Sequence, residues 1–396
     1  MAISSLTYAP PVRRDARPPR PDYELLEAAG AFADEGKPLE AVMKVFQHLF
    51  PSQAIPDLAK NPFSFVQGSS RVTAKIEGDD LAITVPLVRL PTGGSAIAAL
   101  RFVLTKLSAN GQLYQPRLRG EDLYLEYRDK VSRLHPAKLL EVLRRMPFAA
   151  DRNDDWLIGQ FSALPLERAA IDPPTDDEAA RCEAIWRAHW NDVEELVTES
   201  QRKRSMFFLN EVTAYAFYKI KFAIPLSGFL GARLSEAAGT FNNSQEDPDK
   251  RTAALAKCAK EMRAVSDEEL RKNVGHVVYA LNPLSEGKAS ILSGYFAGGD
   301  YIEAIEEART SGRPFDAALA LICTYTYLLA QFTWPEVVEN ELEAGLALAS
   351  GKPWREAANL LYEHAQRLVA KFGEDAESGD GDDPDDDAGT ATGGQG

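Results

Sequence analysis

The chain has 396 residues, of which 45% are hydrophobic and 26% charged, an ordinary globular composition with enough length for more than one core. Its formal net charge is −15, but the acidic residues are unevenly distributed. Residues 374–396 contain nine acids and no base, so the first 373 residues carry a net charge of only −6. Neither part has the broad basic face that duplex nucleic acid requires, so duplex nucleic acid is not an expected partner.

The N-terminal residues 1–22 are rich in proline and arginine and have no continuous apolar segment. We expect this arm to be disordered and to contain no secretory signal. The three cysteines, Cys182, Cys258 and Cys323, lie far apart and form no CxxC pair, which is typical of a reducing compartment. The sequence therefore predicts a cytoplasmic protein.

Residues 23–165 combine two kinds of periodicity. Apolar residues alternate with polar ones in two pairs of segments, 72–76 with 81–87 and 112–118 with 123–127, and each pair predicts a β-hairpin. Helical spacing precedes, separates and follows these hairpins, at residues 23–50, 97–107 and 135–146. The order helix, antiparallel strands, helix, hairpin, helix predicts an α+β domain with a sheet covered by helices.

The remaining chain is predicted to be a separate all-α domain at residues 175–373, with no convincing strand. Capping-box patterns begin at Thr175, Ser266 and Asp300, and Gly and Pro residues mark helix ends. A proline- and acid-rich linker at 166–174 is expected to join the two domains. Residues 374–396 have too few apolar groups to fold, so they are expected to form a disordered acidic tail.

One segment, Ala317 to Trp334, contains no charged residue and is long enough to be considered as a membrane span. It also contains threonines, tyrosines and Gln331, and acidic residues flank it. We therefore interpret it as the buried central helix of the α domain and expect no membrane span.

Residues 95–162 resemble a known family. The pattern runs from Ala99-Leu100-Arg101-Phe102 through Leu107 to Gly111, then from Gln115 to Leu125, then through His135-Pro136 and Leu139-Leu140. Together with the order of elements over 23–162, about a third of the chain, it is similar to YbjN and type III secretion chaperone-like domains. The resemblance implies a compact α+β domain, often dimeric, that binds extended segments of other proteins or acts as a regulator. It implies no catalytic residues.

The sequence contains no recognisable catalytic or cofactor-binding motif. Phosphate-binding patterns such as GxxxxGK[ST] and GxGxxG do not occur, nor do GxSxG or HExxH. The five histidines are isolated, and neither Glu183 with His189 nor Glu363 with His364 has the spacing that places two metal ligands on one helix face. We therefore expect no catalytic residue, no metal site and no cofactor.

Two groups of residues are candidate partner-binding sites. Aromatic residues near two lysines can stack against a ligand or a partner, and the candidates are Phe207, Tyr215 and Tyr218. The alternative is a buried helix whose lysines reach the surface. The cluster Arg202, Lys203 and Arg204 can receive an anion or the acidic tail. The alternative for this cluster is a solvated helix end with cations near its C-terminus.

These observations favour a non-enzymatic adaptor or chaperone-like regulator that acts through protein–protein surfaces. Another protein is the expected partner, and a homodimer is one expected assembly. The α+β domain would pair a sheet edge with an extended segment, and the helical domain would provide a second surface. Two alternatives stay open: an enzyme whose site in the helical domain no motif reveals, and a structural component of a larger assembly.

Overall fold

The computed structural model describes residues 4–12, 21–108, 111–241 and 246–374, and their contacts divide the chain into two compact units. The sheet unit comprises residues 9–285. The helical unit comprises residues 4–8 and 286–374. This division differs from the expected one, because the chain divides at residue 285 and not at the predicted linker 166–174. The first helices of the expected all-α domain belong to the same unit as the sheet.

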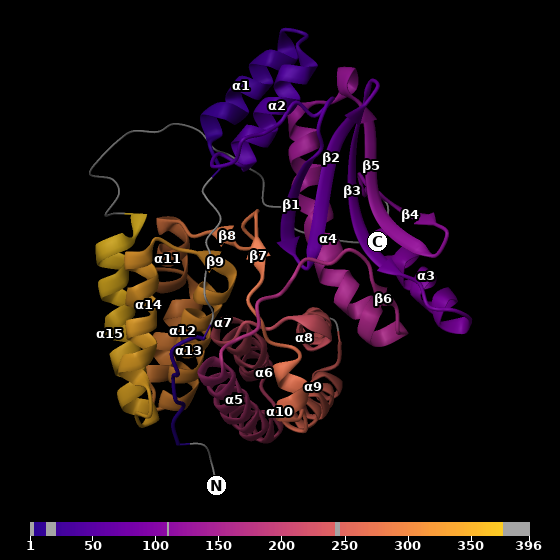
Figure 1. The fold of residues 1–396 in the computed structure, drawn as a ribbon. Coiled ribbons are helices and arrows are strands. Elements are labelled where there is room, and N and C mark those ends of the chain that lie inside the picture. Colours follow the sequence, from indigo (N-terminus) through magenta and orange to yellow (C-terminus); the bar gives the residue numbers. More distant parts are fainter. Residues whose placement is uncertain (1–3, 13–20, 109–110, 242–245, 375–396) are drawn as a thin grey trace. The chain divides into compact units, whose positions relative to one another are not determined.

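The sheet unit contains one antiparallel sheet (Figure 1). Its strands are β1 (Phe63–Gly68), β2 (Ser70–Glu77), β3 (Asp80–Arg89), β4 (Gln115–Arg119), β5 (Asp122–Lys130), β6 (Leu164–Pro165) and β7 (Val278–Tyr279). The order is β4-β5-β3-β2-β1-β7, and β6 pairs with β3. Both expected hairpins are confirmed as β2–β3 and β4–β5. Gly78 and Gly120 turn them with φ values of 62° and 64°, a conformation that favours glycine.

The helices around this sheet are α1 (Tyr23–Asp34), α2 (Pro38–Leu49), α3 (Gly94–Leu107) and α4 (Pro136–Phe161), with a 3₁₀ turn η1 (Val131–Arg133) before α4. The three predicted helical stretches are therefore confirmed, and the α+β architecture with them. Helix α4 packs on β1, β2 and β3. Its buried residues Leu139, Leu143 and Met146 share one core with Ile83 and Val85 of β3.

Three short strands lie where we expected none. β7 pairs with β1 through Gly68 and Val278, so a strand from the expected all-α region extends the sheet. β8 (Ser285–Glu286) and β9 (Phe332–Thr333) are two residues each. The predicted linker also forms backbone hydrogen bonds with distant residues. Ala169 N–H donates to Ser69 O at 2.9 Å, and Asp172 forms an antiparallel β-bridge with His276. Pairing with distant strands, and not local propensity, forms these pieces.

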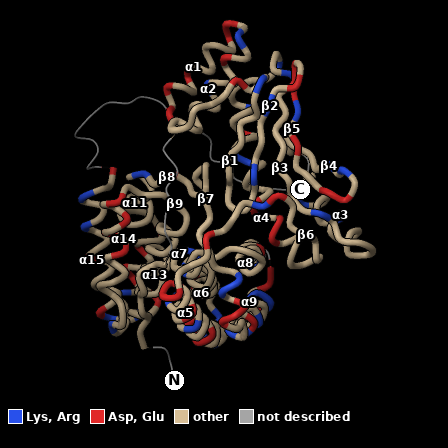
Figure 2. Tube along the Cα trace, viewed as in Figure 1, with Lys and Arg blue, Asp and Glu red and all other residues tan. Residues whose placement is uncertain are grey.

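The rest of the sheet unit is helical. Its elements are α5 (Asp176–Lys203), α6 (Met206–Ala214), the π-helical turn η2 (Tyr215–Lys219), α7 (Ile220–Ala223), α8 (Gly228–Phe241), α9 (Pro248–Arg263) and α10 (Asp267–Arg271). The capping box at Thr175 is confirmed, since its hydroxyl accepts from Glu178 N–H while the Glu178 carboxylate accepts from Thr175 N–H. Acidic and basic residues intermingle along α5 and α9 (Figure 2).

The N-terminal arm is not disordered where the structure describes it. In the helical unit, Leu6 is buried and its carbonyl accepts from Gly351 N–H at 2.9 Å, while Tyr8 OH donates to Glu343 at 2.8 Å. In the sheet unit, Val12 is buried and donates to Ala223 O at 2.8 Å. The prediction of a disordered arm is thus wrong for residues 4–12. Residues 13–20 and the acidic tail beyond Glu374 lie outside the described residues.

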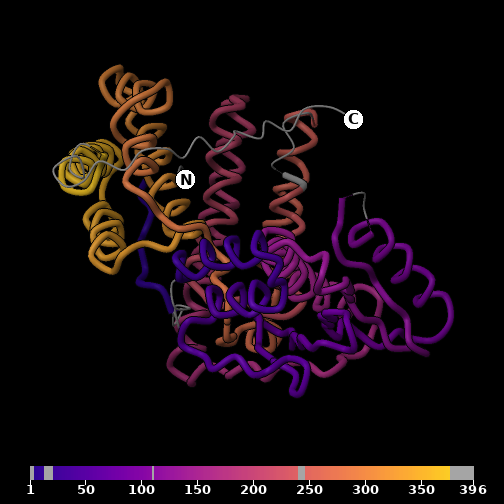
Figure 3. The backbone as a smooth tube through the Cα atoms, turned by 90° about the horizontal axis from the view of Figure 1, so that it is seen from above, coloured from indigo at the N-terminus to yellow at the C-terminus, as the bar shows by residue number. Residues whose placement is uncertain are grey.

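The helical unit consists of helices packed around one central helix. Its helices are α11 (Ala289–Phe296), α12 (Asp300–Thr310), α13 (Pro314–Gln331), α14 (Glu336–Ala349) and α15 (Trp354–Phe372). α13 packs against α12, α14 and α15, and α15 also packs against α11. Helices α14 and α15 lie side by side in two perpendicular views (Figure 1 and Figure 3).

Helix α13 covers residues 317–331 of the buried helix expected over Ala317–Trp334, whereas Phe332 and Thr333 form β9. All of its residues from Ala317 to Thr326 are buried, and so are Leu328, Leu329 and Ala330. The ring of Tyr325 lies 5.0 Å from that of Phe296. Within the described parts of the chain, no helix combines the length and apolar composition needed to span a bilayer. The core-helix interpretation therefore fits the packing of the helical unit.

Replacing Leu328 of α13 by lysine is expected to lower the free energy of unfolding by several kcal/mol, because the side chain is fully buried and an ammonium there has no partner. Urea denaturation followed by circular dichroism measures the loss. Val337→Lys is the matched control, since Val337 is 52% exposed on the neighbouring α14 and should change stability by less than about 0.5 kcal/mol. Equal effects of the two lysines would contradict the burial of α13.

Candidate functional site

The predicted basic cluster forms the C-terminal end of α5. Arg202 is exposed and pairs with Glu199 one turn earlier, where Nε donates at 2.8 Å. The ammonium of Lys203 lies 4.7 Å from the centre of the Phe208 ring, and Arg204 ends the helix in the left-handed conformation with φ of 52°. These cations therefore sit where the helix dipole favours them, which matches the alternative of a solvated helix end.

The three predicted aromatic residues do not form one surface. Phe207 is exposed in the first turn of α6, and Tyr218 is half-buried in η2. Tyr215 is fully buried, so the prediction that it contacts a partner is corrected: its hydroxyl donates to Asp192 at 2.9 Å inside the sheet unit.

The buried hydroxyl of Tyr215 belongs to a polar cluster around the π-helical turn. Lys219 donates to Tyr215 and lies 3.6 Å from Asp192, so it does not extend into solvent as the snorkelling alternative supposed. The imidazole Nε2 of His189 contacts Ala216 O at 2.8 Å, a carbonyl of this turn. Burial lowers the pKa of His189 to about 3, so its ring is neutral and donates this bond. The cluster closes the core and is not open to a partner.

The sheet unit exposes apolar residues at one end of its sheet. Ile97 and Leu104 of α3 are 57% and 60% exposed, and α3 lies against β4, whose Leu118 is 50% exposed. β4 is the terminal strand, so its outer edge is unpaired in the sheet. That strand is short and carries Pro116 and two arginines, features that discourage pairing with a further strand. The β4 edge is therefore poorly suited to strand addition.

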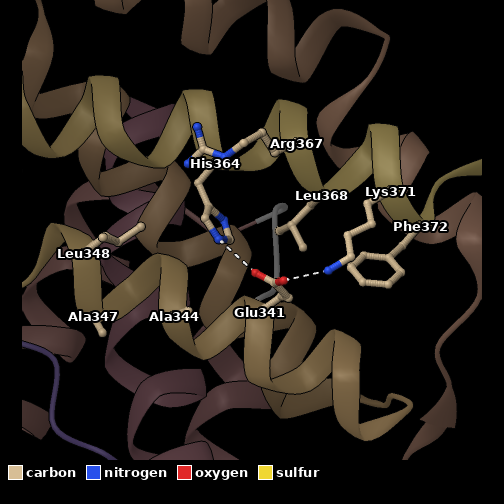
Figure 4. Close-up of a pocket in the computed structure, with 9 residues that line it drawn as sticks. All are labelled: Glu341, Ala344, Ala347, Leu348, His364, Arg367, Leu368, Lys371 and Phe372. Atoms are coloured by element: carbon tan, nitrogen blue, oxygen red, sulfur yellow. Dashed lines mark hydrogen bonds and ion pairs between the residues drawn. The ribbon is translucent and has the colours of Figure 1, made fainter.

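The helical unit contains a groove of 620 Å³ between α14 and α15 (Figure 4). Its lining residues are Glu341, Ala344, Ala347, Leu348, His364, Arg367, Leu368, Lys371 and Phe372. This volume falls in the range of about 300–1,000 Å³ that is usual for ligand sites. Most of the lining is apolar, and Leu348 is 45% exposed although it is a large aliphatic side chain. The groove therefore offers apolar surface that no described part of the chain covers.

A line of polar groups crosses the groove floor. Glu341 lies between two cationic or ionisable groups, with one oxygen 2.9 Å from Lys371 Nζ and the other 3.7 Å from His364 Nε2 (Figure 4). On the other side of the ring, His364 Nδ1 lies 2.9 Å from the hydroxyl of Tyr325 on α13. The same hydroxyl also lies 3.3 Å from Leu361 O, so the phenol is within hydrogen-bond distance of two groups on α15.

Gly345 makes this arrangement sterically feasible. A Cβ at this position of α14 would lie 2.6 Å from Cε1 of Tyr325 and 2.9 Å from Nδ1 of His364. Real side chains do not tolerate such distances, so only glycine lets α14 approach the phenol and imidazole so closely. The three helices are thus held together beneath the groove.

Within the described part of the chain, the charges of the groove leave one cation without a counter-ion. Lys371 lowers the pKa of Glu341, which is therefore ionised and neutralised by that lysine. Burial, together with the nearby Arg367 guanidinium, lowers the pKa of His364, so the imidazole is neutral at pH 7. Arg367 is exposed and makes no ion pair with any described residue. The lining therefore has a net charge of one positive unit, located on Arg367.

This arrangement is suited to binding. Apolar side chains can enter between Leu348, Leu368 and Phe372, and a carboxylate beside them can accept from the Arg367 fork. The polar groups on the floor are already engaged with one another. Among the described residues, no group of three or more histidine, cysteine or acidic side chains is arranged to hold a metal ion.

Sequence reasoning did not identify this groove. In the sequence His364 stands out only as a metal-ligand candidate beside Glu363. In the structure it contacts Glu341 and Tyr325, which belong to other helices. One local signal was present: Ala344 and Leu348 are one helical turn apart and lie off the buried face that Leu342 and Leu346 define.

Comparisons with known proteins add no assignment. No protein-family model matches the chain, and no curated protein matches it. The similarity of residues 23–162 to YbjN and type III secretion chaperone-like domains therefore stays a hypothesis.

The electrostatics of the groove predict how His364 titrates. Its imidazole should titrate below pH 6.5, because burial disfavours the charged form. Arg367→Gln should raise the midpoint by removing a nearby positive charge, and Glu341→Gln should lower it by removing a negative one. NMR of the imidazole Cε1–H across pH 4–8 measures all three values. A midpoint at or above 6.5, or shifts in the opposite directions, would contradict the described geometry.

Proposed function

We propose that the protein is a non-enzymatic adaptor or chaperone-like regulator and that the α14–α15 groove binds an amphipathic segment of another protein. The observation that carries this proposal is the coincidence, in a single groove, of exposed apolar surface with a cation, Arg367, that no acidic residue among those described neutralises. The partner segment supplies apolar anchors and a carboxylate. The same proposal places the protein in the cytoplasm, because none of its three cysteines is in a disulfide.

Burial of a partner's apolar side chains in the groove can contribute enough free energy for binding. Burying one leucine-sized side chain against Leu348, Leu368 and Phe372 contributes about 1.5–3 kcal/mol. Two such anchors exceed the loss of side-chain freedom on binding, which is about 0.5–1.5 kcal/mol for each ordered side chain. A few anchors of this kind dominate the affinity of most interfaces.

The charge of the groove selects the partner's chemistry. Glu341 is neutralised by Lys371, so Arg367 determines the charge that an incoming segment meets. A carboxylate opposite Arg367 can accept two parallel hydrogen bonds, whereas a lysine there would be repelled. We therefore expect an acidic residue among the partner's apolar anchors.

The shape of the groove favours a helical partner. Its walls are two neighbouring helices, and a third helix can place its side-chain ridge between them. An amphipathic helix with anchors at positions i, i+4 and i+7 matches this mode of recognition. The sheet unit is proposed to contribute a second surface around Ile97 and Leu104, which is also where a homodimer would form.

Selection of a displayed helical peptide library against the full chain tests this proposal. The selected peptides should share apolar residues at helical spacing with one aspartate or glutamate. Leu348→Asp should weaken their binding at least tenfold, since it places a charge in the apolar wall. Arg367→Glu should weaken it as well and should reduce its dependence on salt.

Val337→Asp is the matched control, because Val337 is exposed on the same helix but does not line the groove. It should bind the selected peptides as the unmodified chain does. Peptides that bind Leu348→Asp undiminished, or a selection dominated by basic sequences, would contradict the proposed function.

A further inference from the structure

Three aspartates of one helix face point into the interior of the sheet unit. Asp151, Asp154 and Asp155 lie on the same side of α4, and Asp154 is 1% exposed. One cation faces them: Arg168 donates to Asp155 through Nη2 at 2.6 Å and lies 3.3 Å from Asp154 through Nε. Three ionised carboxylates beside one guanidinium would leave two uncompensated negative charges in a buried place, which is strongly unfavourable.

The turn between β1 and β2 approaches this cluster closely. Gly68 has a φ of 60°, and a Cβ there would lie 1.9 Å from Oδ1 of Asp151, so only glycine fits. The next residue, Ser69, donates its backbone N–H to the same oxygen at 2.7 Å. Ser69 O in turn accepts from Ala169 N–H, next to Arg168. The aspartates therefore join α4, the β1–β2 turn and residues 168–169.

The hydroxyl of Ser69 lies between two carboxyl groups of the cluster. Its oxygen lies 3.0 Å from Oδ1 of Asp151 and 2.6 Å from Oδ2 of Asp154. A hydroxyl has one proton and can donate to only one carboxylate. If both contacts are hydrogen bonds, a second proton is needed, and one of the two carboxyl groups carries it.

The surrounding donors locate that proton. Oδ1 of Asp151 already accepts the Ser69 N–H, so it is an acceptor and takes the hydroxyl proton as well. Asp154 then donates from Oδ2 to Ser69. The Nε of Arg168 lies 3.3 Å from Oδ2 of Asp154 and forms no hydrogen bond among the described atoms.

The charges around Asp154 do not offset the rise in its pKa that burial causes. Burial raises the pKa of Asp154 well above the ordinary value; Arg168 opposes this rise, whereas Asp155 and Asp151 add to it. Burial likewise raises the pKa of Asp155 and, to about 6, that of Asp151, while Arg168 lowers both and Gly228 N–H stabilises Asp155. No described group of such ligands is arranged to hold a metal ion instead.

We propose that Asp154 binds one proton at neutral pH and that this proton fastens the β1–β2 turn and residues 168–169 to α4. Loss of the proton at higher pH places a second carboxylate against Ser69 and loosens this joint. The device lies in the sheet unit and is independent of the groove in the helical unit. It makes the sheet unit responsive to pH without a histidine.

Infrared difference spectroscopy at pH 7 tests the proposal directly. The full chain should show the carbonyl band of a buried protonated carboxylic acid. Asp154→Asn should remove this band while keeping the fold, because the amide can donate to Ser69 as the acid does. Asp122→Asn is the matched control, since Asp122 is an ion-paired aspartate of β5 with a lowered pKa, and it should keep the band. Absence of the band from the unmodified chain, or its persistence in Asp154→Asn, overturns the proposal.

The pH dependence of stability provides the second measurement. A carboxyl whose pKa is raised in the folded state stabilises at low pH, and this contribution is lost as pH rises from the unfolded toward the folded pKa. Between pH 5 and 8 the folded-to-unfolded ratio of the unmodified chain should fall relative to that of Asp154→Asn, by up to about tenfold per pH unit. Asp122→Asn should follow the unmodified chain. Parallel profiles for the unmodified chain and Asp154→Asn would contradict the assignment.

Discussion

The burial of α4 is the constraint on which the sheet unit depends. This helix of 26 residues is about 39 Å long and packs on the sheet with one part and on α8 with another. Gly159 permits the second contact, because a Cβ there would lie 2.1 Å from the Phe229 ring. A helix covered on so many sides cannot keep all of its charged residues in water. The aspartates on its inner face are therefore held by Ser69, by Arg168 and by a proton.

The helical unit is organised around the burial of α13. Its central helix α13 is enclosed by α12, α14 and α15, and this enclosure buries a long segment that has no charged residue after Asp316. α14 packs against only α13 and α15 among the stronger helix contacts, so its outer residues Ala344 and Leu348 stay uncovered. The groove thus results from the position of α14 at the end of the helical layer. Exposed apolar surface of this kind is typical of binding sites.

Sequence reasoning succeeded where short-range patterns decide the structure. The β2–β3 and β4–β5 hairpins have period-two alternation around Gly78 and Gly120, and the capping box at Thr175 starts α5 as expected. It failed where distant segments decide. β7 exists only because Val278 pairs with Gly68, far away in the chain, and the expected linker is fixed by contacts to Ser69 and His276.

The functional residues were harder to predict for the same reason. Arg202 and Tyr215 are basic and aromatic, residue types that are common in binding sites. In the structure Arg202 forms an ion pair with Glu199, and Tyr215 is buried with its hydroxyl bonded to Asp192. The groove combines residues from α14 and α15 with a phenol from α13, and no spacing in the sequence announces that combination. The proton proposed on Asp154 is inferred from the nearness of Ser69, some eighty residues earlier in the chain, which no sequence pattern indicates.

Methyl NMR of the full chain with a selected acidic amphipathic peptide tests whether the α14–α15 groove is the binding site. Leu348 and Leu368 line the groove, whereas Ile97 and Leu104 belong to the exposed face of α3 in the sheet unit. Peptide addition should shift the methyl signals of Leu348 and Leu368, with contacts from the peptide carboxylate to Arg367. Shifts confined to Ile97 and Leu104 would contradict it and would place binding on the sheet unit.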